Sequence, residues 1–515
     1  MALELNKQFS YALTMMEQPH VHLFITGKAG TGKSTLLDYF CEHARTKPIV
    51  LAPTGVAALN VKGQTIHRFF NFYIDVTPEK ILSKESAPSD PEFYKNLHTI
   101  IIDEVSMLRA DMLDCIDVFL RMYGADESQA FGGVKMIFVG DLYQLPPVTN
   151  QTESDMFTHH YNTPYFFSAK ALEGEPLEVI ELETIYRQKD EDFVHLLNKI
   201  RTNSVEDADI DTLNTRYIPI ASEDESAHTI HLTTTNSKAD AINATHLEAL
   251  PGKLHMRKAS IDGDFGKEYH PTAQALEFKI GAHIMLLNND PKQRWVNGTL
   301  GKIIALRHDE EGDEYIRVRL HDTEQSVSVY PFMWEVYKFS VNAGSIISKP
   351  AGSFTQYPFR LAWAITIHKS QGKTFDHVVI DMDKGAFSGG QTYVAFSRCT
   401  SFEGIRLATP IKKGHIRTDA RIFKFLTSHA YAQAALHLSW EDKITMLHRA
   451  LETQHPLEMV YLKANDHKST RIIIPRSIGD EEYRGKIFPA LRAYCTTHHA
   501  EYVFHIGRIL QLKTV

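Results

Sequence analysis

Eight consecutive residues have the types and spacing needed to hold a nucleotide phosphate. Residues 27–34 read Gly-Lys-Ala-Gly-Thr-Gly-Lys-Ser and fit the pattern G-x-x-x-x-G-K-[ST]. In such a loop the glycines let backbone N–H groups point at phosphate oxygens, and the following helix adds the positive end of its dipole. Lys33 would reach the β- and γ-phosphates, and the Ser34 hydroxyl would bind Mg²⁺. The loop therefore predicts a protein that binds a nucleoside triphosphate.

Two carboxylates at the end of an apolar run supply the groups that hydrolysis needs. Residues 100–104 read Ile-Ile-Ile-Asp-Glu. Asp103 would hold Mg²⁺ through Ser34 or a water molecule, and Glu104 would orient or deprotonate the attacking water. An acidic pair after a strand is by itself usually a solvated strand end, so this interpretation depends on the P-loop.

Three further polar residues are candidates for contact with the γ-phosphate. Gln144 lies in the segment Gly-Asp-Leu-Tyr-Gln-Leu-Pro-Pro, whereas Arg187 and Arg398 lie in Ile-Tyr-Arg-Gln and Tyr-Val-Ala-Phe-Ser-Arg. A fixed guanidinium neutralises the charge that grows on the γ-phosphoryl group in the transition state. Most arginines are merely solvated, and the Gly-Asp segment alone fits a turn before a proline-fixed loop. The residue types alone therefore do not decide between contact with the γ-phosphate and the simpler interpretation of solvated arginines and a turn.

The order of apolar strands and helical patterns indicates how these residues could meet. The clearest predicted strands are residues 21–26, 49–52, 99–102 and 135–139, and a helix is predicted after the P-loop. Such alternation is typical of a parallel sheet flanked by helices, in which ligands bind at the carboxyl ends of the strands. Because the P-loop and the acidic pair each follow a strand, both are expected at one edge of the sheet.

The rest of the chain predicts units of different character. Residues 176–245 resume the α/β pattern, and a polar, proline-containing excursion from the first sheet is expected at 77–95. Many short strands with Gly, Asn and Asp turns between 280 and 350 predict a small inserted β-barrel. The α/β pattern returns at 359–383. Further individual elements are predicted as a strand at 230–233, a helix at 238–250, barrel strands at 282–287, 301–306, 315–320 and 326–330, a helical connector at 430–455, and short strands around one helix in the last sixty residues.

Bulk composition bounds the class of protein. The 515 residues are 43% hydrophobic and 23% charged, which is ordinary for a soluble protein and allows several compact units. A net charge of −8 argues mildly against a protein that coats duplex DNA, but not against nucleic acid held in an internal channel. The four scattered cysteines fit a reducing compartment, and the sequence has no apolar run of spanning length. A cytoplasmic, bacterial nucleoid-associated protein is expected.

Several ordered strings resemble the Pif and RecD-like helicases of superfamily 1B. They span residues 21 to 401 and are FITGKAGTGKSTLL, LAPTGVAALNVKGQTIHRFF, IIIDEVSML, FVGDLYQLPPV, ETIYRQKDEDFVHLLNKIR, RWVNGTLGKI, LAWAITIHKSQGKTFD and TYVAFSRCTS. The resemblance implies an α/β protein with two RecA-like P-loop motor domains and ATP between them. It implies domain 1A at 1–175 with a wedge element at about 72–96, and domain 2A at 176–285 and 351–430. It further implies a Src-homology-like barrel, 2B, at 286–350, followed by the helical connector at 431–455.

The resemblance also assigns roles to individual residues. Implied for ATP are Gln8, which would read adenine, Gly27, Lys28, Ala29, Gly30, Thr31, Gly32, Lys33, Ser34 and Thr35 of the P-loop, and Gly372 and Lys373. Implied for hydrolysis are Lys33, Asp103, Glu104, Gln144, Arg187 and Arg398, with Ser34 and Asp103 as the Mg²⁺ ligands. Implied for the DNA strand are Pro53, Thr54, Gly55, Thr65 and His67 in the first motor domain and Thr366, His368, Lys369 and Ser370 in the second. The aromatic residues Phe69, Phe70, Phe72 and Tyr73 would stack on bases or separate a duplex, or would belong to the core.

The last unit, from about residue 456 to 515, resembles a WYL domain, a small Sm-like β-barrel. The matching strings are Val-Tyr-Leu at 460–462, Arg-Ile-Ile-Ile-Pro at 471–475, Leu-Arg-Ala-Tyr-Cys at 491–495 and Phe-His-Ile-Gly-Arg-Ile at 504–509. Valine replaces the namesake tryptophan, and His505 and Gly507 replace the usual Arg and Asp. The resemblance implies a basic pocket for single strands or nucleotides, built from Arg471, Arg476, Arg492 and Arg508, or else a barrel with solvated arginines.

The function implied is an ATP-dependent 5′-to-3′ DNA helicase with ATP and Mg²⁺ as cofactors. The expected partners are single-stranded DNA and duplex junctions in forks, R-loops or G-quadruplexes, and the expected state is a monomer with no membrane contact. One alternative is a single-strand translocase that unwinds poorly. Another is a WYL-type nucleic-acid-binding regulator whose motor has lost activity, although the intact Lys33, Glu104 and Arg398 speak against it.

Overall fold

A computed structural model shows the chain as two compact units, residues 1–418 and 419–515, and each is described by itself. The described residues are 6–19, 21–73, 76–84, 87–148, 160–188, 190–218, 229–321, 323–342, 345–383, 385–463, 466, 468–483 and 485–515. No helix in these ranges is long and apolar enough to cross a membrane.

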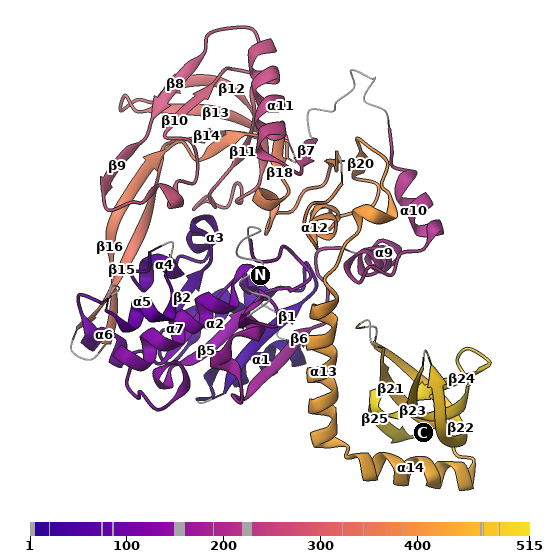
Figure 1. Ribbon diagram of the computed structural model, residues 1–515. Coiled ribbons are helices and arrows are strands. Elements are labelled where there is room, and N and C mark those ends of the chain that lie inside the picture. Colours follow the sequence, from indigo (N-terminus) through magenta and orange to yellow (C-terminus); the bar gives the residue numbers. More distant parts are fainter. Residues whose placement is uncertain are drawn as a thin grey trace. The chain divides into compact units, whose positions relative to one another are not determined.

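The first sheet of the larger unit has six parallel strands in the order β3-β2-β4-β5-β1-β6. Figure 1 labels β1, β2, β5 and β6 of this sheet. Its strands are β1 (His22–Gly27), β2 (Ile49–Ala52), β3 (Gln64–Thr65), β4 (Thr99–Ile102), β5 (Lys135–Val139) and β6 (Leu177–Leu182). Side chains alternate between its faces: Ile25 and Ile101 pack with α1 (Lys7–Glu17) and α2 (Lys33–His43), whereas Phe24 packs with Phe166 on the other face. The strands predicted at 49–52, 99–102 and 135–139 are present with those bounds.

Strand β6 lies beyond the predicted boundary of the first domain at residue 175. It pairs in parallel with β1 from the His22–Leu177 pair to the Gly27–Leu182 pair. The chain therefore completes the first sheet with its last strand before it enters the second sheet.

Short helices and one long helix surround an aromatic cluster beside the first sheet. The helices are α3 (Gly55–Asn60), α4 (Ile66–Phe69), α5 (Pro78–Leu82), α6 (Pro91–Lys95) and α7 (Ala110–Tyr123). The Phe72 ring stacks on Phe70 with centroids 5.2 Å apart, and both rings meet Phe119 of α7 edge-on. This cluster anchors the predicted wedge at 72–96, of which residues 74, 75, 85 and 86 lie outside the described residues.

The second sheet of the larger unit has four parallel strands in the order β18-β7-β19-β20. They are β7 (Ile230–Thr233), β18 (Ala364–Thr366), β19 (Val378–Asp381) and β20 (Ile405–Leu407). The helices around it are α9 (Glu191–Arg201), α10 (Asp207–Asn214), α11 (Asn236–Ala249) and α12 (Gln391–Ser397). The chain between β7 and β18 leaves this sheet and returns to it.

That excursion forms an all-β segment, which we call the insertion (residues 255–361). Its strands are β8 (His255–Lys258), β9 (Ser260–Gly263), β10 (Ala275–Phe278), β11 (His283–Leu286), β12 (Leu300–His308), β13 (Glu314–Leu320), β14 (Ser326–Val329), β15 (Phe332–Asn342), β16 (Ser345–Gln356) and β17 (Phe359–Leu361). Five form an antiparallel sheet in the order β14-β13-β12-β11-β17, and the β15–β16 hairpin pairs with β9. The strands extend beyond the predicted 286–350 on both sides, because β17 pairs with β11 and β9 pairs with β16, while β8 and β10 form a two-stranded sheet of their own.

The core of the insertion contains two tryptophans. Trp295, and Trp363 just after β17, are buried in one hydrophobic cluster with Phe278 and Phe359. The indole N–H of Trp295 donates to Asn288, and the Trp363 ring lies between two histidine rings. Burial of such large rings stabilises the insertion by its own hydrophobic core.

The smaller unit consists of two helices and a five-stranded antiparallel sheet. The helices are α13 (Ala420–His437) and α14 (Trp440–Thr453), and the strands are β21 (Leu457–Leu462), β22 (Lys468–Tyr483), β23 (Lys486–Cys495), β24 (Ala500–His505) and β25 (Ile509–Thr514). The sheet order is β24-β23-β22-β21-β25, and Leu447 of α14 packs against its apolar face. The predicted single helix among the last sixty residues is wrong for the described residues there. They hold three strands of six residues, one of ten and one of sixteen, with a 3-10 turn at Ile506–Arg508.

Candidate active site

The phosphate-binding loop joins β1 to α2 in a conformation that only glycine adopts readily. Gly30 and Gly32 both have φ of 83°, in the left-handed region, and Gly32 caps the N-terminus of α2. A Cβ on Gly30 would lie 2.5 Å from the Cβ of Arg187, so the loop and the chain after β6 are in close contact. The Thr31 hydroxyl closes the loop by donating to the Lys28 carbonyl over 3.0 Å.

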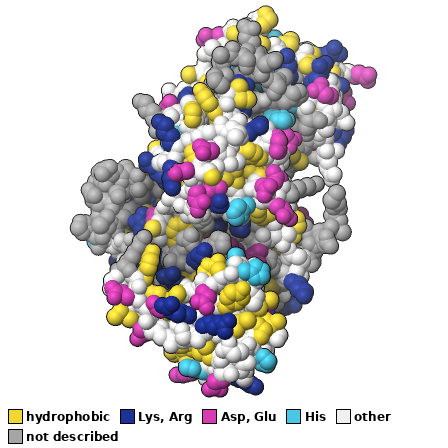
Figure 2. Space-filling model, turned by 90° about the vertical axis from the view of Figure 1, so that its right-hand side faces the viewer, with side chains coloured by type: hydrophobic (Ala, Val, Ile, Leu, Met, Phe, Trp, Pro, Cys, Tyr) yellow, Lys and Arg dark blue, Asp and Glu magenta, His cyan; other side chains and the backbone are white. Residues whose placement is uncertain are grey.

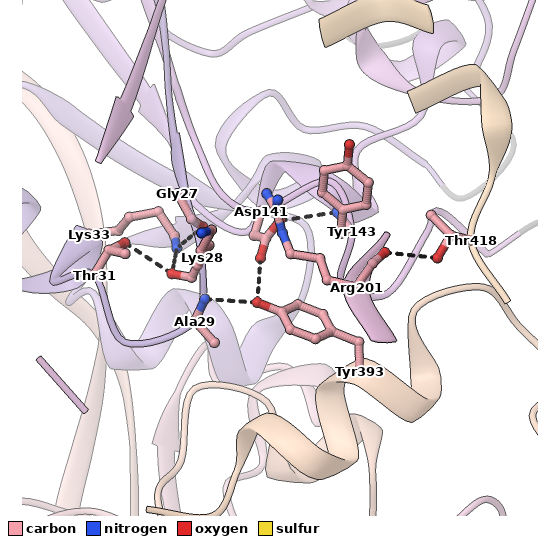
Figure 3. Close-up of polar contacts among 10 residues, drawn as sticks. All are labelled: Gly27, Lys28, Ala29, Thr31, Lys33, Asp141, Tyr143, Arg201, Tyr393 and Thr418. Atoms are coloured by element: carbon pink, nitrogen blue, oxygen red, sulfur yellow. Dashed lines mark hydrogen bonds and ion pairs between the residues drawn. The ribbon is translucent and has the colours of Figure 1, made fainter. Parts of the chain in front are cut away.

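The Lys33 ammonium folds back over this loop. Its Nζ donates to the carbonyl oxygens of Gly27 over 2.7 Å and Lys28 over 3.1 Å (Figure 3). Burial lowers the pKa of Lys33, and the nearby Asp141 and Glu104 oppose that shift. Ser34 and Thr35 are exposed in the first turn of α2, where hydroxyls can meet a ligand. A cation and a helix N-terminus thus converge on the loop.

Asp103 and Glu104 follow β4, whose neighbour β5 separates it from β1. Burial and the adjacent Glu104 charge raise the pKa of Asp103 to about 7. Burial also raises the pKa of Glu104, while Lys33 and a hydrogen bond oppose the shift. Glu104 has φ of 49°, a strained conformation for a non-glycine residue. Two half-buried carboxylates at a strand end form a site that favours an added cation.

The donors present fit Mg²⁺. The Ser34 hydroxyl and the Asp103 carboxylate are hard oxygen ligands, and Mg²⁺ typically takes one or two protein oxygens besides phosphate and water. Within the described ranges no three His, Cys, Asp or Glu side chains form a metal cluster. A magnesium ion here would therefore depend on nucleotide phosphates for most of its coordination.

Two guanidinium groups approach the same region from the second sheet and its connection. Arg187 Nη1 donates to the Ser397 carbonyl over 3.2 Å, and Arg398 donates to the Ser397 hydroxyl over 2.8 Å and the Lys373 carbonyl over 3.2 Å. Burial lowers the pKa of Arg187, and burial together with the Arg187 charge lowers that of Arg398 to about 9. Both guanidinium groups donate to uncharged oxygens. A phosphate could therefore accept hydrogen bonds from them while few ion pairs are broken.

Two glutamines that the sequence analysis did not name complete these contacts. Gln371 Nε2 donates to Glu104 Oε2 over 2.7 Å, which joins the turn after β18 to the acidic pair. Gln188 Nε2 donates to the carbonyls of Ser397 over 3.3 Å and Cys399 over 3.0 Å. Each glutamine adjoins a predicted site residue in the chain, and that adjacency was the available signal.

The remaining nucleotide candidates lie at the margins of the loop. Gln8 Oε1 accepts from the Glu183 N–H over 3.0 Å, and its neighbour Phe9 lies edge-on to Tyr186 and close to Gly32. Gln8 thus lies next to a residue that packs against the loop, and its contact with a base stays a prediction.

Lys373 and Gln144 are placed differently from each other. Lys373 Nζ donates to Asn297 of the insertion over 2.6 Å rather than pointing at the P-loop. Burial and the charge of Arg360 lower the pKa of Lys373 to about 8. Gln144 is buried where α12 begins, because Gly390 lies directly against its carbonyl oxygen. Gly372, at φ of 77°, is exposed.

The predicted strand-contacting residues of the first sheet are partly engaged within the protein. Thr54 caps α3, with Pro53 before it and Gly55 after it. The Thr65 hydroxyl lies 2.6 Å from the hydroxyl of Tyr269, a fully buried residue of the insertion, and it also caps α4. His67 is half-buried in α4. These contacts fix the segment against the insertion.

The corresponding residues of the second sheet form one turn after β18. Thr366 Oγ1 accepts from the Lys369 N–H over 3.3 Å, and buried Ser370 donates to the Ile367 carbonyl over 2.7 Å, so both hydroxyls shape the turn. Lys369 is exposed. His368 stacks on Phe387, whose ring is 60% exposed and was not predicted.

Phe72 lies in the aromatic core rather than at the surface. It is 7% exposed, and Phe69 and Phe70 are also buried. Tyr73, at 61% exposed, is the aromatic of this group that faces solvent. The burial favours the core interpretation for the three phenylalanines.

The arginines of the smaller unit make different contacts from one another. The Arg471 guanidinium lies over the rings of Tyr502 at 4.7 Å and Phe504 at 5.7 Å, and its buried Nε and Nη1 have no hydrogen-bond partner among the described residues. Arg492 Nε donates to Glu481 over 2.7 Å, and Arg508 is half-buried.

Figure 2 shows one face of the molecule, over which basic and acidic side chains are interspersed.

Comparisons with known proteins agree with this geometry. Residues 6–210 match the model of the PIF1-like helicase family. The ATP-dependent DNA helicase Pif1 of Bdellovibrio bacteriovorus is 30% identical over 416 residues, which cover 79% of this chain and 88% of that protein. The mouse ATP-dependent DNA helicase PIF1 is 31% identical over 410 residues, or 78% of this chain. The chain spans about 60% of the length of the vertebrate relatives that it matches.

A solved structure shows the same arrangement. Bacteroides sp Pif1 in complex with ADP-AlF4 is 33% identical and has a TM-score of 0.76, covering 84% of this chain and 98% of the other. The TM-score for Bacteroides Pif1 bound to ssDNA is 0.59 at the same identity and coverage. The α/β fold with parallel RecA-like sheets is therefore shared.

Proposed function

Because the chain belongs to the Pif1-like helicase family, we propose that it is an ATP-dependent DNA helicase. It would move 5′ to 3′ along single-stranded DNA and separate duplex or structured DNA such as forks, R-loops and G-quadruplexes. The observation that carries the proposal is the Glu104–Gln371 hydrogen bond, because it brings a hydrolytic carboxylate of the first sheet against a turn of the second.

The nucleotide chemistry follows from the residues around that contact. The P-loop N–H groups and Lys33 would bind the phosphates, and Glu104 would accept a proton from the attacking water. Mg²⁺ held by Ser34 and Asp103 would neutralise charge on the β- and γ-phosphate oxygens. Arg187 and Arg398 would exchange carbonyl partners for the γ-phosphate and stabilise its transition-state charge.

Movement along DNA would follow from alternate closure of the two sheets on ATP. Gln371 adjoins the turn at 366–370, so a displacement that accompanies the contact with Glu104 is transmitted to that turn. Thr54 and His67 on the first sheet, and His368 and Lys369 on the second, would hold the strand through its phosphates and sugars. Such contacts are largely independent of sequence.

The test is steady-state ATP hydrolysis with and without a single-stranded oligonucleotide, on the wild type and on Lys33→Ala. We expect strong stimulation by DNA and its loss in the variant. Strand displacement on duplexes with a 5′ or a 3′ tail then tests polarity. Turnover that is indifferent to DNA would contradict the helicase proposal.

A translocase with weak unwinding is the second candidate. The burial of Phe69, Phe70 and Phe72 supports it, because these rings are not offered to a duplex end. Tyr73 is the exposed alternative for that role. Stopped-flow translocation compared with strand displacement separates the two candidates, and Tyr73→Ala should reduce displacement alone if the helicase proposal holds.

For the smaller unit we propose a WYL-like role in modulating single-strand binding. Arg471 supports it, because two buried guanidinium nitrogens that find no acceptor among the described residues favour an anionic ligand. Arg471→Gln should weaken single-strand affinity several-fold, whereas Arg449→Gln, at an exposed position of α14 outside the predicted pocket, serves as the control. Equal affinities in all three proteins would contradict this role.

A further inference from the structure

Tyr393 joins the phosphate loop to Asp141 through its hydroxyl. The Ala29 backbone N–H donates to the Tyr393 oxygen over 3.0 Å, and the hydroxyl donates to Asp141 Oδ2 over 3.2 Å (Figure 3). The side chain is 3% exposed, and burial beside Asp141 raises the pKa of the phenol, so the hydroxyl keeps its proton. One oxygen atom therefore accepts from the loop and donates to a carboxylate.

Asp141 is itself held by a buried arginine. Arg201 Nη2 lies 3.3 Å from Asp141 Oδ1, and both side chains are almost fully buried. The Arg201 guanidinium also lies over the Tyr143 ring, 3.9 Å from its centroid, and the Tyr143 N–H donates to Asp141 (Figure 3). A buried ion pair with these additional contacts holds the carboxylate in one place, so the Tyr393 hydroxyl has a fixed acceptor.

These contacts connect the two sheets of the larger unit. Ala29 and Asp141 follow β1 and β5 of the first sheet, whereas Tyr393 lies in α12 and Arg201 ends α9 beside the second. Gly390, at the start of α12, lies against the carbonyl oxygens of the 143–144 segment, where a Cβ would come within 2.2 Å. The helix that carries Tyr393 is thus seated directly on the first sheet's loops.

The Ala29 N–H belongs to the loop whose backbone donors bind phosphate. A phosphate oxygen and the Tyr393 hydroxyl would compete for that donor. We propose that Tyr393 is a positioning residue that occupies the Ala29 N–H until a nucleotide phosphate displaces it, after which its hydroxyl remains on Asp141 alone. This inference rests on the proposed nucleotide-binding function. It adds a residue that contacts the Asp141–Arg201 ion pair and whose hydrogen bonds would differ between the empty and the phosphate-bound loop.

The test compares binding of ATPγS, a slowly hydrolysed ATP analogue, to the full-length wild type and to Tyr393→Phe. Loss of the competing hydroxyl should tighten ATPγS binding about five-fold, because the net free energy of one hydrogen bond, about 1 kcal/mol, corresponds to a change of that size in Kd. In steady-state hydrolysis the KM for ATP should fall by a similar factor while kcat changes less than about two-fold. A tyrosine that merely supports the loop would instead give weaker binding and a higher KM, and that result would overturn the proposal.

Tyr357→Phe is the matched control. Tyr357 is also a buried phenol that donates to a carboxylate, Glu314, but it lies in the insertion. It should leave ATPγS affinity unchanged, and thermal unfolding of each variant verifies that it is folded. If the wild type binds no ATPγS, the nucleotide-binding function fails and the inference with it. If the wild type binds but Tyr393→Phe does not bind more tightly, the inference alone fails. Binding without DNA-stimulated turnover removes only the helicase proposal.

Discussion

Gln371 and Glu104 are hydrogen-bonded across the two sheets, with 2.7 Å between Nε2 and Oε2. The glutamine amide is the neutral partner of the half-buried Glu104 carboxylate. Desolvation raises the pKa of Glu104, and this hydrogen bond lowers it. One side chain from the second sheet thereby sets both the orientation and the basicity of the group that would activate water. Hydrolysis then depends on how the sheets are placed.

Replacing Gln371 by alanine should slow ATP hydrolysis and leave ATP binding intact. We expect kcat to fall about ten-fold or more because Glu104 loses its orientation, while ATPγS affinity changes less than about two-fold. Since the lost hydrogen bond also lowered the pKa of Glu104, the rise of kcat with pH should move to higher pH. A pH profile of kcat for both proteins measures this, and an unchanged profile would remove the proposed role.

Replacing Arg398 by lysine should separate binding from turnover in another way. The lysine retains the charge but loses the bidentate fork, so transition-state stabilisation should fall and kcat should drop on the order of 10²-fold or more. ATPγS affinity should change little. Arg421→Lys, at an exposed ion pair with Asp419, is the control and should keep the wild-type kcat. Equal kcat in both variants would argue against Arg398 as a γ-phosphate contact.

Replacing Gly30 by alanine should abolish nucleotide binding through a clash rather than through chemistry. The added Cβ would meet Arg187 at 2.5 Å in a backbone with φ of 83°. Gly174→Ala is matched in φ, at 82°, but nothing lies within 4 Å of its Cβ. The control should lose about 1 kcal/mol of stability from the left-handed backbone and still bind ATPγS. Calorimetric titration distinguishes them, and ATPγS binding by Gly30→Ala would show that the loop tolerates the clash.

His22 should make the larger unit less stable in mild acid. Its Nδ1 accepts the Met136 N–H over 3.1 Å, and burial, with the nearby Lys135 charge, lowers its pKa from 6.5 to about 4. A lowered folded pKa contributes stability above pH 6.5 that is lost as pH falls toward 4. Between pH 7.5 and 5 this amounts to about 2 kcal/mol.

Denaturant unfolding of the wild type and of His22→Gln at both pH values measures this contribution. The variant should be less stable than the wild type at pH 7.5, and the difference between the two proteins should shrink at pH 5. The subtraction removes other titrating groups common to both. A difference that is constant with pH would show that His22 is not held neutral by folding.

The parts of the fold that the sequence predicted are those governed by local pattern. The strands at 49–52 and 99–102 are short, continuous apolar runs, and burial on both faces of a parallel sheet requires that composition. By contrast, short strands were predicted for the last sixty residues, whereas β22 runs over sixteen residues through Pro475 and Gly479, with a register shift between Pro475 and Ser477. A β-bulge accommodates the proline, and the neighbouring residues do not predict this bulge.

The same distinction holds for the site. The P-loop and Asp103–Glu104 follow strand ends and were predictable from their own neighbourhoods. Gln371 and Tyr393 act through partners more than 250 residues away in the chain, at Glu104 and Ala29. Phe72 is an aromatic residue of the type that stacks on bases, but its ring packs against Phe119 of α7 instead. Such contacts depend on tertiary packing, which residue type and spacing do not contain.

The placement of the tryptophans determines what intrinsic fluorescence can report. Of four in the chain, Trp295, Trp334 and Trp363 lie in or against the core of the insertion, and Trp440 begins α14. The P-loop contains no such fluorophore, so a bound nucleotide would not quench emission by direct contact. An ATP-dependent change in tryptophan emission would therefore indicate a conformational change in the insertion or the smaller unit, and it can be measured without an attached dye.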